Sequence, residues 1–360
     1  MLHPSSRRRF RHLVLRLTVL GIFACGDESA QSAAARPADD SRRELVYVTN
    51  EGAGTLTIID AATDSIIGSL PVGSRPRGVR VAGDGRLVYV ALSGSPRCPP
   101  PMSDEECARL GADKTRDGIG EIDAAARRVV RVLPGGSDPE TFDLSRDGTR
   151  LIVSNEDVDS ASFVDVASGS ISRTVPVGRE PEGVRLHPDG RTVWVTGETD
   201  HDVTVLDTGS GAELARIPVG RRPRDLVFSA DGAMAFVSAE VDGTVSVVDA
   251  RGYALLRTIR LPEGAKPMGL ALADGDTRLW VANGRAGTVS LIDLARDSVL
   301  ASIDVGVRPW GIALTSDGAR LYTANGPSGD VSVVDTERMQ VLRRIPTGEL
   351  PWGVAIGPAP

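Results

Sequence analysis

The segment 222–249, RPRDLVFSADGAMAFVSAEVDGTVSVVD, contains the unit that decides the fold. Short apolar or β-branched runs alternate here with tight turns; the runs are 226–228, 235–238 and 245–249. The first two runs are separated by Asp231-Gly232, a pair that favours tight turns because both residues tolerate positive φ. A fourth run at 255–261 completes a unit of four short strands, which predicts one antiparallel sheet.

Seven copies of this unit follow one another along the chain. Each has an aspartate at the end of one apolar run, namely Asp60, Asp123, Asp165, Asp207, Asp249, Asp293 and Asp335. Each also has a proline before another run, namely Pro76, Pro139, Pro181, Pro223, Pro267, Pro309 and Pro351. Successive aspartates are 63, 42, 42, 42, 44 and 42 residues apart. A fixed period of this length, made of strands and turns, predicts a β-propeller with one blade per repeat.

We therefore predict an all-β fold, a seven-bladed β-propeller of four-stranded antiparallel blades at 45–357. The repeats begin with the second strand of a blade, at 46–50, and end with the innermost strand of a blade, at 352–356. The C-terminal strand is expected to pair with the N-terminal blade, which closes the ring without an open strand edge.

Two positions in each repeat are expected at one mouth of the central channel. Because neighbouring strands are antiparallel, the residue after the periodic proline and the end of the second strand lie on one face. The candidate ligand-binding residues are Arg77, Glu140, Glu156, Glu182, Glu198, Arg224, Glu240, Trp310 and Trp352. This set could bind a small polar ligand, and its five carboxylates would suit a divalent cation such as calcium. Alternatively, the carboxylate–arginine pairs only hold neighbouring blades together.

The second blade carries an insertion at about 93–119, since its repeat is 63 − 42 = 21 residues longer than the others. It lies on the face of the mouth, as a lid, a docking surface or a tolerated insertion. Cys98 and Cys107 lie within it, with eight residues between them. In an oxidising compartment we expect a disulfide; a metal site is the weaker alternative, because no histidine lies nearby.

The N-terminal segment is typical of an exported protein. Residues 1–24 combine five arginines with an apolar stretch too short to span a membrane. Ile22-Phe23-Ala24-Cys25 resembles a bacterial lipobox, so Cys25 is the expected lipidation site and membrane anchor. Cleavage near 33–35, which would release a secreted protein, is the alternative, and both the Sec and the twin-arginine export routes remain open. Residues 25–44 are predicted to be a flexible tether in the periplasm.

Charge and missing motifs exclude several functions. The chain has a net charge of −7, and without residues 1–24 it has −7 − 5 = −12. An acidic body without a basic stripe argues against nucleic acid as a partner. The sequence has no Gly-x-Ser-x-Gly elbow, no P-loop and no Cys-x-x-Cys-His haem motif. His201 is the only histidine expected at the mouth and hence the only neutral-pH base there.

The repeats also resemble a known family. The segments Tyr47-Val48-Thr49-Asn50, Thr57-Ile58-Ile59-Asp60 and Pro71-Val72-Gly73 resemble the repeats of YVTN-family bacterial β-propellers. Glu180-Pro181-Glu182-Gly183 and Pro351-Trp352-Gly353-Val354 are similar to β-propeller proteins associated with pyrroloquinoline-quinone (PQQ)-dependent catabolism. The resemblance covers about 45–357 and implies an exported propeller linked to periplasmic quinoprotein alcohol oxidation. It supplies no catalytic residues, and the insertion with its cysteines departs from the family pattern.

Three functions follow from these observations. The first is a non-enzymatic scaffold that binds a periplasmic protein, such as a quinoprotein dehydrogenase or its cytochrome. The second is a carrier that binds a small molecule or a metal ion at the channel mouth. The third is a lactonase-like hydrolase that uses His201 or a carboxylate as its base. No cofactor other than a possible divalent cation is expected.

Overall fold

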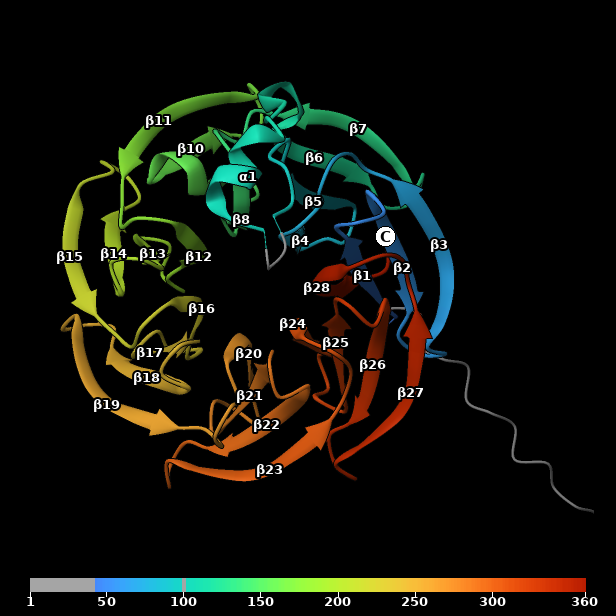
Figure 1. The fold of residues 1–360 in the computed structure, drawn as a ribbon, viewed down its shortest axis with the longest axis vertical. Coiled ribbons are helices and arrows are strands. Elements are labelled where there is room, and N and C mark those ends of the chain that lie inside the picture. The colour runs from blue at the N-terminus through green and yellow to red at the C-terminus, as the bar shows by residue number, and fades with distance from the viewer. Residues whose placement is uncertain (1–42, 99–101) are drawn as a thin grey trace, which may run out of the picture. The chain divides into compact units, whose positions relative to one another are not determined.

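The computed structural model describes residues 43–98 and 102–360, and these residues form seven four-stranded antiparallel sheets arranged around a central channel (Figure 1). The predicted fold class is therefore confirmed. The expected export signal, the lipidation site Cys25 and nearly all of the tether lie outside the described residues.

The blades are numbered in chain order, and their strands are given from the channel outward. Blade one contains β28 (Pro351–Pro358), β1 (Glu44–Asn50), β2 (Thr55–Asp60) and β3 (Ser65–Pro71). Blade two contains β4 (Val79–Val81), β5 (Leu87–Leu92), β6 (Gly118–Asp123) and β7 (Arg128–Leu133). Blade three contains β8 (Pro139–Leu144), β9 (Arg150–Asn155), β10 (Ser160–Asp165) and β11 (Ser170–Pro176). Blade four contains β12 (Pro181–Leu186), β13 (Thr192–Gly197), β14 (Asp202–Asp207) and β15 (Glu213–Pro218).

The remaining three blades follow the same order. Blade five contains β16 (Pro223–Phe228), β17 (Met234–Ala239), β18 (Thr244–Asp249) and β19 (Ala254–Arg260). Blade six contains β20 (Pro267–Ala273), β21 (Arg278–Asn283), β22 (Thr288–Asp293) and β23 (Ser298–Asp304). Blade seven contains β24 (Pro309–Leu314), β25 (Arg320–Asn325), β26 (Asp330–Asp335) and β27 (Gln340–Pro346). The helices are α1 (Asp104–Arg109), η2 (Lys114–Arg116) and η3 (Glu156–Val158), and none in the described chain is long and apolar enough to cross a membrane.

The ring is closed by the C-terminal strand, as predicted. β28 pairs with β1 in antiparallel register, from Glu44 opposite Pro358 to Asn50 opposite Pro351. Beyond the strands, the Ala359 N–H donates to the carbonyl oxygen of Arg43 over 2.8 Å. Both ends of the described chain therefore lie side by side, on the face opposite the mouth.

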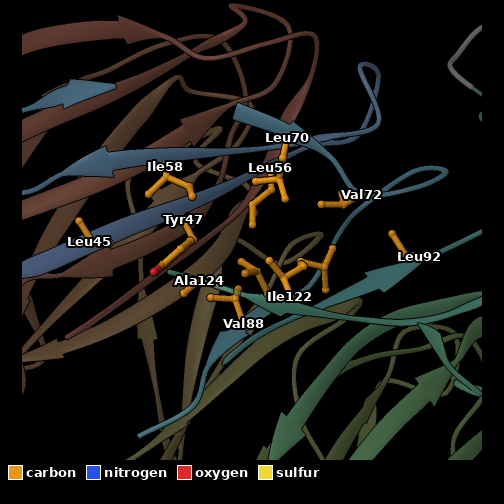
Figure 2. Close-up of a cluster of buried hydrophobic side chains, with 12 residues drawn as sticks. Leu45, Tyr47, Leu56, Ile58, Leu70, Val72, Val88, Leu92, Ile122 and Ala124 are labelled. Atoms are coloured by element: carbon orange, nitrogen blue, oxygen red, sulfur yellow. The ribbon is translucent and has the colours of Figure 1, made fainter. Parts of the chain in front are cut away.

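The hydrophobic core is divided into seven clusters, each between two neighbouring blades. Figure 2 shows the cluster between blades one and two, where Tyr47 and Leu56 lie close to Val88 and Ile122. Middle strands are buried on both faces because a neighbouring blade covers each side, whereas the outermost strands face solvent and consist mainly of exposed and partly buried residues. Inter-blade packing on both sides explains why the middle strands are almost continuously buried.

Glycines allow the innermost strands to approach one another closely. A Cβ atom on Gly311 would lie 2.7 Å from the carbonyl oxygen of Trp352, and one on Gly353 would lie 2.5 Å from that of Arg77. No larger residue fits at these contacts unless the backbone shifts. The glycines therefore hold blades seven, one and two close together around the channel and fix the positions of the side chains at its mouth.

Candidate ligand-binding site at the channel mouth

A cavity of about 770 Å³ lies at the mouth of the channel, which is the volume of a typical small-molecule site. Six of the nine predicted residues line it: Arg77, Glu140, Glu156, Arg224, Trp310 and Trp352. Glu182 instead lines a smaller cavity deeper in the channel, and Glu198 and Glu240 line neither, since both bind arginine side chains beside the mouth. The cavity has a polar side, from blades two, three and five, and an aromatic side, from blades seven and one.

The first ion cluster of the polar side is centred on Arg77, whose side chain is 4% exposed. Its guanidinium lies 2.6 Å from Asp138 and 3.2 Å from Glu156, and it also pairs with Glu140. Burial lowers the pKa of Arg77, but the surrounding carboxylates, Glu140 first, outweigh this and raise it. Arg77 is therefore a fixed cation that joins blades two and three.

The second ion cluster is centred on Arg224 in blade five. Its guanidinium lies 2.6 Å from Glu240 and pairs with Glu182 and Glu198 of blade four. Arg222 lies at the edge of the cluster, with its Nε donating to Glu198 over 2.6 Å. The five glutamates expected at the mouth thus all bind arginine side chains, as in the alternative in which carboxylate–arginine pairs hold neighbouring blades together.

In each ion cluster two glutamates bind the same guanidinium nitrogen, which is Nη1 of Arg77 for one pair and Nη1 of Arg224 for the other. Burial raises the pKa of Glu140 well above its usual value, and the neighbouring Glu156 adds to this effect. Burial likewise raises the pKa of Glu182, with a contribution from Glu198. Two neighbouring negative charges repel each other, and this favours the protonated form of the more deeply buried glutamate. Glu140 and Glu156 both line the cavity, and a carboxyl group that holds a proton can donate a hydrogen bond as well as accept one.

The aromatic side has a different construction. The rings of Trp310 and Trp352 have centroids 5.5 Å apart and are inclined by 36°. The guanidiniums of Arg308 and Arg224 lie over the Trp310 ring, 4.9 and 5.3 Å from its centroid, as cation–π contacts. In blade seven Gly326 occupies the position of the glutamates at the ends of the second strands of blades three to five, so the indoles remain open to the cavity.

Arg308 is a cation of this site that has no carboxylate partner among the described residues. Unlike Arg77 and Arg224, it forms no ion pair with a carboxylate of the described residues, and it lines the cavity. Burial lowers its pKa from the usual value, but an arginine stays charged at physiological pH. Its guanidinium is available to bind a carboxylate or phosphate with two parallel hydrogen bonds.

The sequence interpretation missed the residue before each periodic proline. All seven have a positive φ, between 41° and 60°: Arg75, Asp138, Glu180, Arg222, Lys266, Arg308 and Leu350. This conformation is unfavourable for residues other than glycine. Arg75, Asp138, Arg222, Arg308 and Leu350 line the cavity. Their common position in the 42-residue repeat is the signal that could have identified them.

The insertion of blade two forms part of the cavity wall. Cys98 and Cys107 are joined by a disulfide, with 5.5 Å between their Cα atoms, and both line the cavity. The insertion is fixed to the rim by polar contacts: Asp117 accepts from the backbone N–H groups of Gly94 and Asp138, over 2.7 and 3.0 Å. Lys114 pairs with Asp157 of blade three. These contacts hold the insertion against the rim, so it acts as a fixed wall of the cavity rather than as a separate docking surface.

Two other expected roles receive little support from the geometry. His201 does not line the cavity, and its Nδ1 lies 2.7 Å from the carbonyl oxygen of Glu198. Within residues 43–98 and 102–360, no three His, Cys, Asp or Glu side chains are arranged to hold a metal ion. The physical reason is that the glutamates of the mouth bind Arg77, Arg222 and Arg224, so their oxygens are not gathered around a common point.

Comparison with solved structures places the fold among seven-bladed propellers. A functionally unknown protein from Desulfotomaculum acetoxidans aligns with a TM-score of 0.73 and 14% identity, over 88% of this chain and 99% of the other. The periplasmic gluconolactonase of Pseudomonas aeruginosa aligns with a TM-score of 0.71 and 22% identity, over 88% and 100%. The hydrazine synthase of Kuenenia stuttgartiensis aligns with a TM-score of 0.68 and 20% identity, over 81% and 92%.

These identities establish a common fold and leave the chemistry open, since propellers host many unrelated functions. No protein-family model matches the chain, and no curated protein matches it. The resemblance to YVTN repeats and to PQQ-associated propellers therefore stays a prediction from the sequence.

Proposed function

We propose that this protein binds a small hydroxylated organic acid in the cavity at the channel mouth. The observation that carries this proposal is the free guanidinium of Arg308 beside the open Trp310–Trp352 pair, in a cavity of about 770 Å³. A cation without a carboxylate partner, next to exposed indoles, suits an anionic ligand with an apolar face.

The two sides of the cavity have different roles in this proposal. Arg308 binds the carboxylate of the ligand, and the carbon skeleton of the ligand packs on the indoles. The polar side recognises hydroxyl groups, because the Glu140–Glu156 pair can donate as well as accept hydrogen bonds. A ligand with both an acid group and hydroxyl groups uses both sides.

The test is calorimetric titration of the purified protein with a panel of sugar acids, simple hydroxy acids and uncharged sugars. We expect the hydroxy or sugar acids to bind, and Arg308→Gln to weaken binding by about tenfold or more, since a charged hydrogen bond contributes roughly 1.5–3 kcal/mol. Arg86→Gln is the matched control, because this side chain is 81% exposed outside the cavity. Equal affinity in the Arg308 variant, or no binding by any acid, contradicts the proposal.

Lactone hydrolysis is a second candidate, favoured by the Glu140–Glu156 pair in the cavity and by the fold similarity to a gluconolactonase. In this reaction Glu156 takes a proton from the attacking water, and the new carbon–oxygen bond forms at the lactone carbonyl. The ring carbon–oxygen bond then breaks, and the departing oxygen receives the proton of Glu140. Glu156 is suited to contact water because its side chain is 39% exposed, compared with 8% for Glu140.

Hydrolysis of gluconolactone above the spontaneous rate tests this candidate. We expect Glu156→Gln to reduce the enzymatic rate by about 10²-fold or more, the usual contribution of a general base. Glu180→Gln is the control, since Glu180 is an exposed rim residue outside the cavity lining. Wild-type activity in Glu156→Gln removes the assigned mechanism, and no activity in the wild type removes the candidate.

A protein partner in the periplasm, as the sequence interpretation expected, is a separate proposal. Native mass spectrometry of the protein from the membrane fraction of its host distinguishes it from ligand binding. A stoichiometric dehydrogenase or cytochrome supports the scaffold. A small added mass on the single chain supports the cavity proposal.

A further inference from the structure

A second cavity lies deeper in the channel and has a distinct character. Its volume is about 70 Å³, and it shares Arg224, Trp310 and Trp352 with the mouth cavity. From there it extends along the innermost strands to Arg80 and Arg185. A cavity of this size has room for a few water molecules or one small ion, and it is too small for the organic ligand of the mouth.

Arg80 has an unsatisfied hydrogen-bond donor here. Its Nε lies 3.2 Å from Asp143, and its Nη1 donates to the carbonyl oxygen of Val79 over 2.9 Å. Its Nη2 is buried and has no hydrogen-bond partner among the described residues. Buried guanidinium N–H groups are rarely left unpaired, so an unpaired group beside a cavity indicates an occupant that accepts hydrogen bonds.

Asp143 binds the Nε of Arg80, but neither it nor Asp225 pairs with Nη2, because both carboxylates also hold other blades together. Asp143 accepts from the backbone N–H of Leu186 over 2.8 Å. Asp225 accepts from the backbone N–H of Leu270 over 3.1 Å, and it also pairs with Arg185 at 3.0 Å. These contacts link blades three to six and fix the carboxylates away from the unpaired N–H.

The charges that line the inner cavity favour an anion. Three arginines line it, Arg80, Arg185 and Arg224, against two acids, Asp225 and Glu182. Glu182 pairs with Arg224 and Asp225 pairs with Arg185, so neither acid adds an uncompensated negative charge. The opposite wall is apolar, with Ile312 and Val354, and it offers a cation no ligands.

We propose that the inner cavity is a binding site for a monoatomic anion such as chloride, held by Arg80 Nη2 and the guanidinium of Arg185. The ion completes the hydrogen bonding of Arg80 and sits beneath the Trp310–Trp352 pair, as the floor of the mouth cavity. This site is independent of the organic ligand proposed above.

Bromide is the probe for this site, because it replaces chloride and can be located by its anomalous scattering. Crystals of the purified protein grown in sodium bromide are expected to show one anomalous peak in the channel, close to Arg80 and Arg185. In solution, sodium bromide is expected to raise Tm in a saturable manner, relative to sodium methanesulfonate at equal ionic strength.

Variants show which residues bind the bromide ion. Arg80→Gln is expected to weaken the apparent bromide affinity by about tenfold or more, because it removes a charged donor. Arg86→Gln, whose exposed side chain lies outside both cavities, is expected to leave the affinity unchanged. If Arg80→Gln does not fold, the wild-type anomalous map decides alone. A channel without an anomalous peak means that only water satisfies Arg80, and this overturns the proposal.

Discussion

The polar and aromatic sides of the mouth are built from the same repeat positions, yet they leave very different surfaces. On the polar side, arginine and glutamate occupy these positions and bind one another, as Arg224 does with Glu182, Glu198 and Glu240. On the aromatic side, tryptophan and glycine occupy them and leave Arg308 without a carboxylate. Charged residues at a channel mouth are thus no sign of a ligand by themselves. The informative feature is a charged group that the protein does not already satisfy.

The largest effect is expected from removing the central cation of the polar side. Arg224→Met leaves three glutamates around a buried site without their arginine, which should lower the free energy of unfolding by about 3–5 kcal/mol. Arg308→Met is the matched change on the aromatic side and should cost less than about 1 kcal/mol, because no ion pair is lost. Chemical unfolding at neutral pH measures both. Similar losses in the two variants contradict the difference between the two sides.

A smaller effect, dependent on pH, is expected at Asp225, which occupies the position of glycines such as Gly311 on the aromatic side. Burial raises the pKa of Asp225 from 3.8 to about 6, although Arg185 lies 3.0 Å away. Between these two values the folded protein holds a proton that the unfolded chain releases, so the stabilising contribution is complete below about pH 4. It is lost as the pH rises through 6.

Asp225→Asn should therefore remove about 2 kcal/mol of pH-dependent change in unfolding free energy between pH 4 and 7, since one pKa unit corresponds to about 1.4 kcal/mol. Unfolding curves of both proteins at several pH values measure this difference. As a control, Asp231→Asn changes an exposed acid whose pKa is lowered by its hydrogen bond to the backbone of Ala233. Parallel pH profiles of the wild type and Asp225→Asn would refute the assignment.

The smallest effect concerns the strained residues before the prolines. Leu350, beside the aromatic side, has a φ of 52°, and Leu350→Gly should raise the free energy of unfolding by about 0.5 kcal/mol. Asp138 has the same φ, but its side chain binds Arg77 at 2.6 Å. Asp138→Gly should therefore destabilise the protein by about 2 kcal/mol or more. Thermal unfolding of both variants tests whether side-chain contacts hold the strained rim on the polar side; stabilisation in both would mean that they do not.

The blade count and the face of the mouth could be predicted because they depend only on spacing and strand direction. A 42-residue period gives one blade per repeat, and antiparallel strands bring the residue after the proline and the end of the second strand to one face. The positive φ before each proline could not be predicted from local rules, since a proline normally favours an extended residue before it. Here the closed ring imposes the tight entry into each innermost strand.

The ion-pair partners of the arginines could not be predicted from the repeat pattern either. Arg77 binds carboxylates of the following blade, whereas Arg224 binds carboxylates of the preceding blade and of its own. The two arginines occupy equivalent positions, so the difference arises from which neighbours supply glutamates and from the insertion, which ties Asp138 to the rim through Asp117. Arg308 has no carboxylate partner because the neighbouring glutamates bind Arg222 and Arg224 instead. This could not be read from the repeat pattern.

The adjacent ends of the described chain have a practical consequence. Because Arg43 and Ala359 are hydrogen-bonded on the face opposite the mouth, an attachment to a surface or a probe at either end starts on the side away from the cavity. A short linker between these ends would allow circular permutants that open in any hairpin turn of that face. In such permutants the two chain ends would lie in a different blade, and the mouth would stay intact.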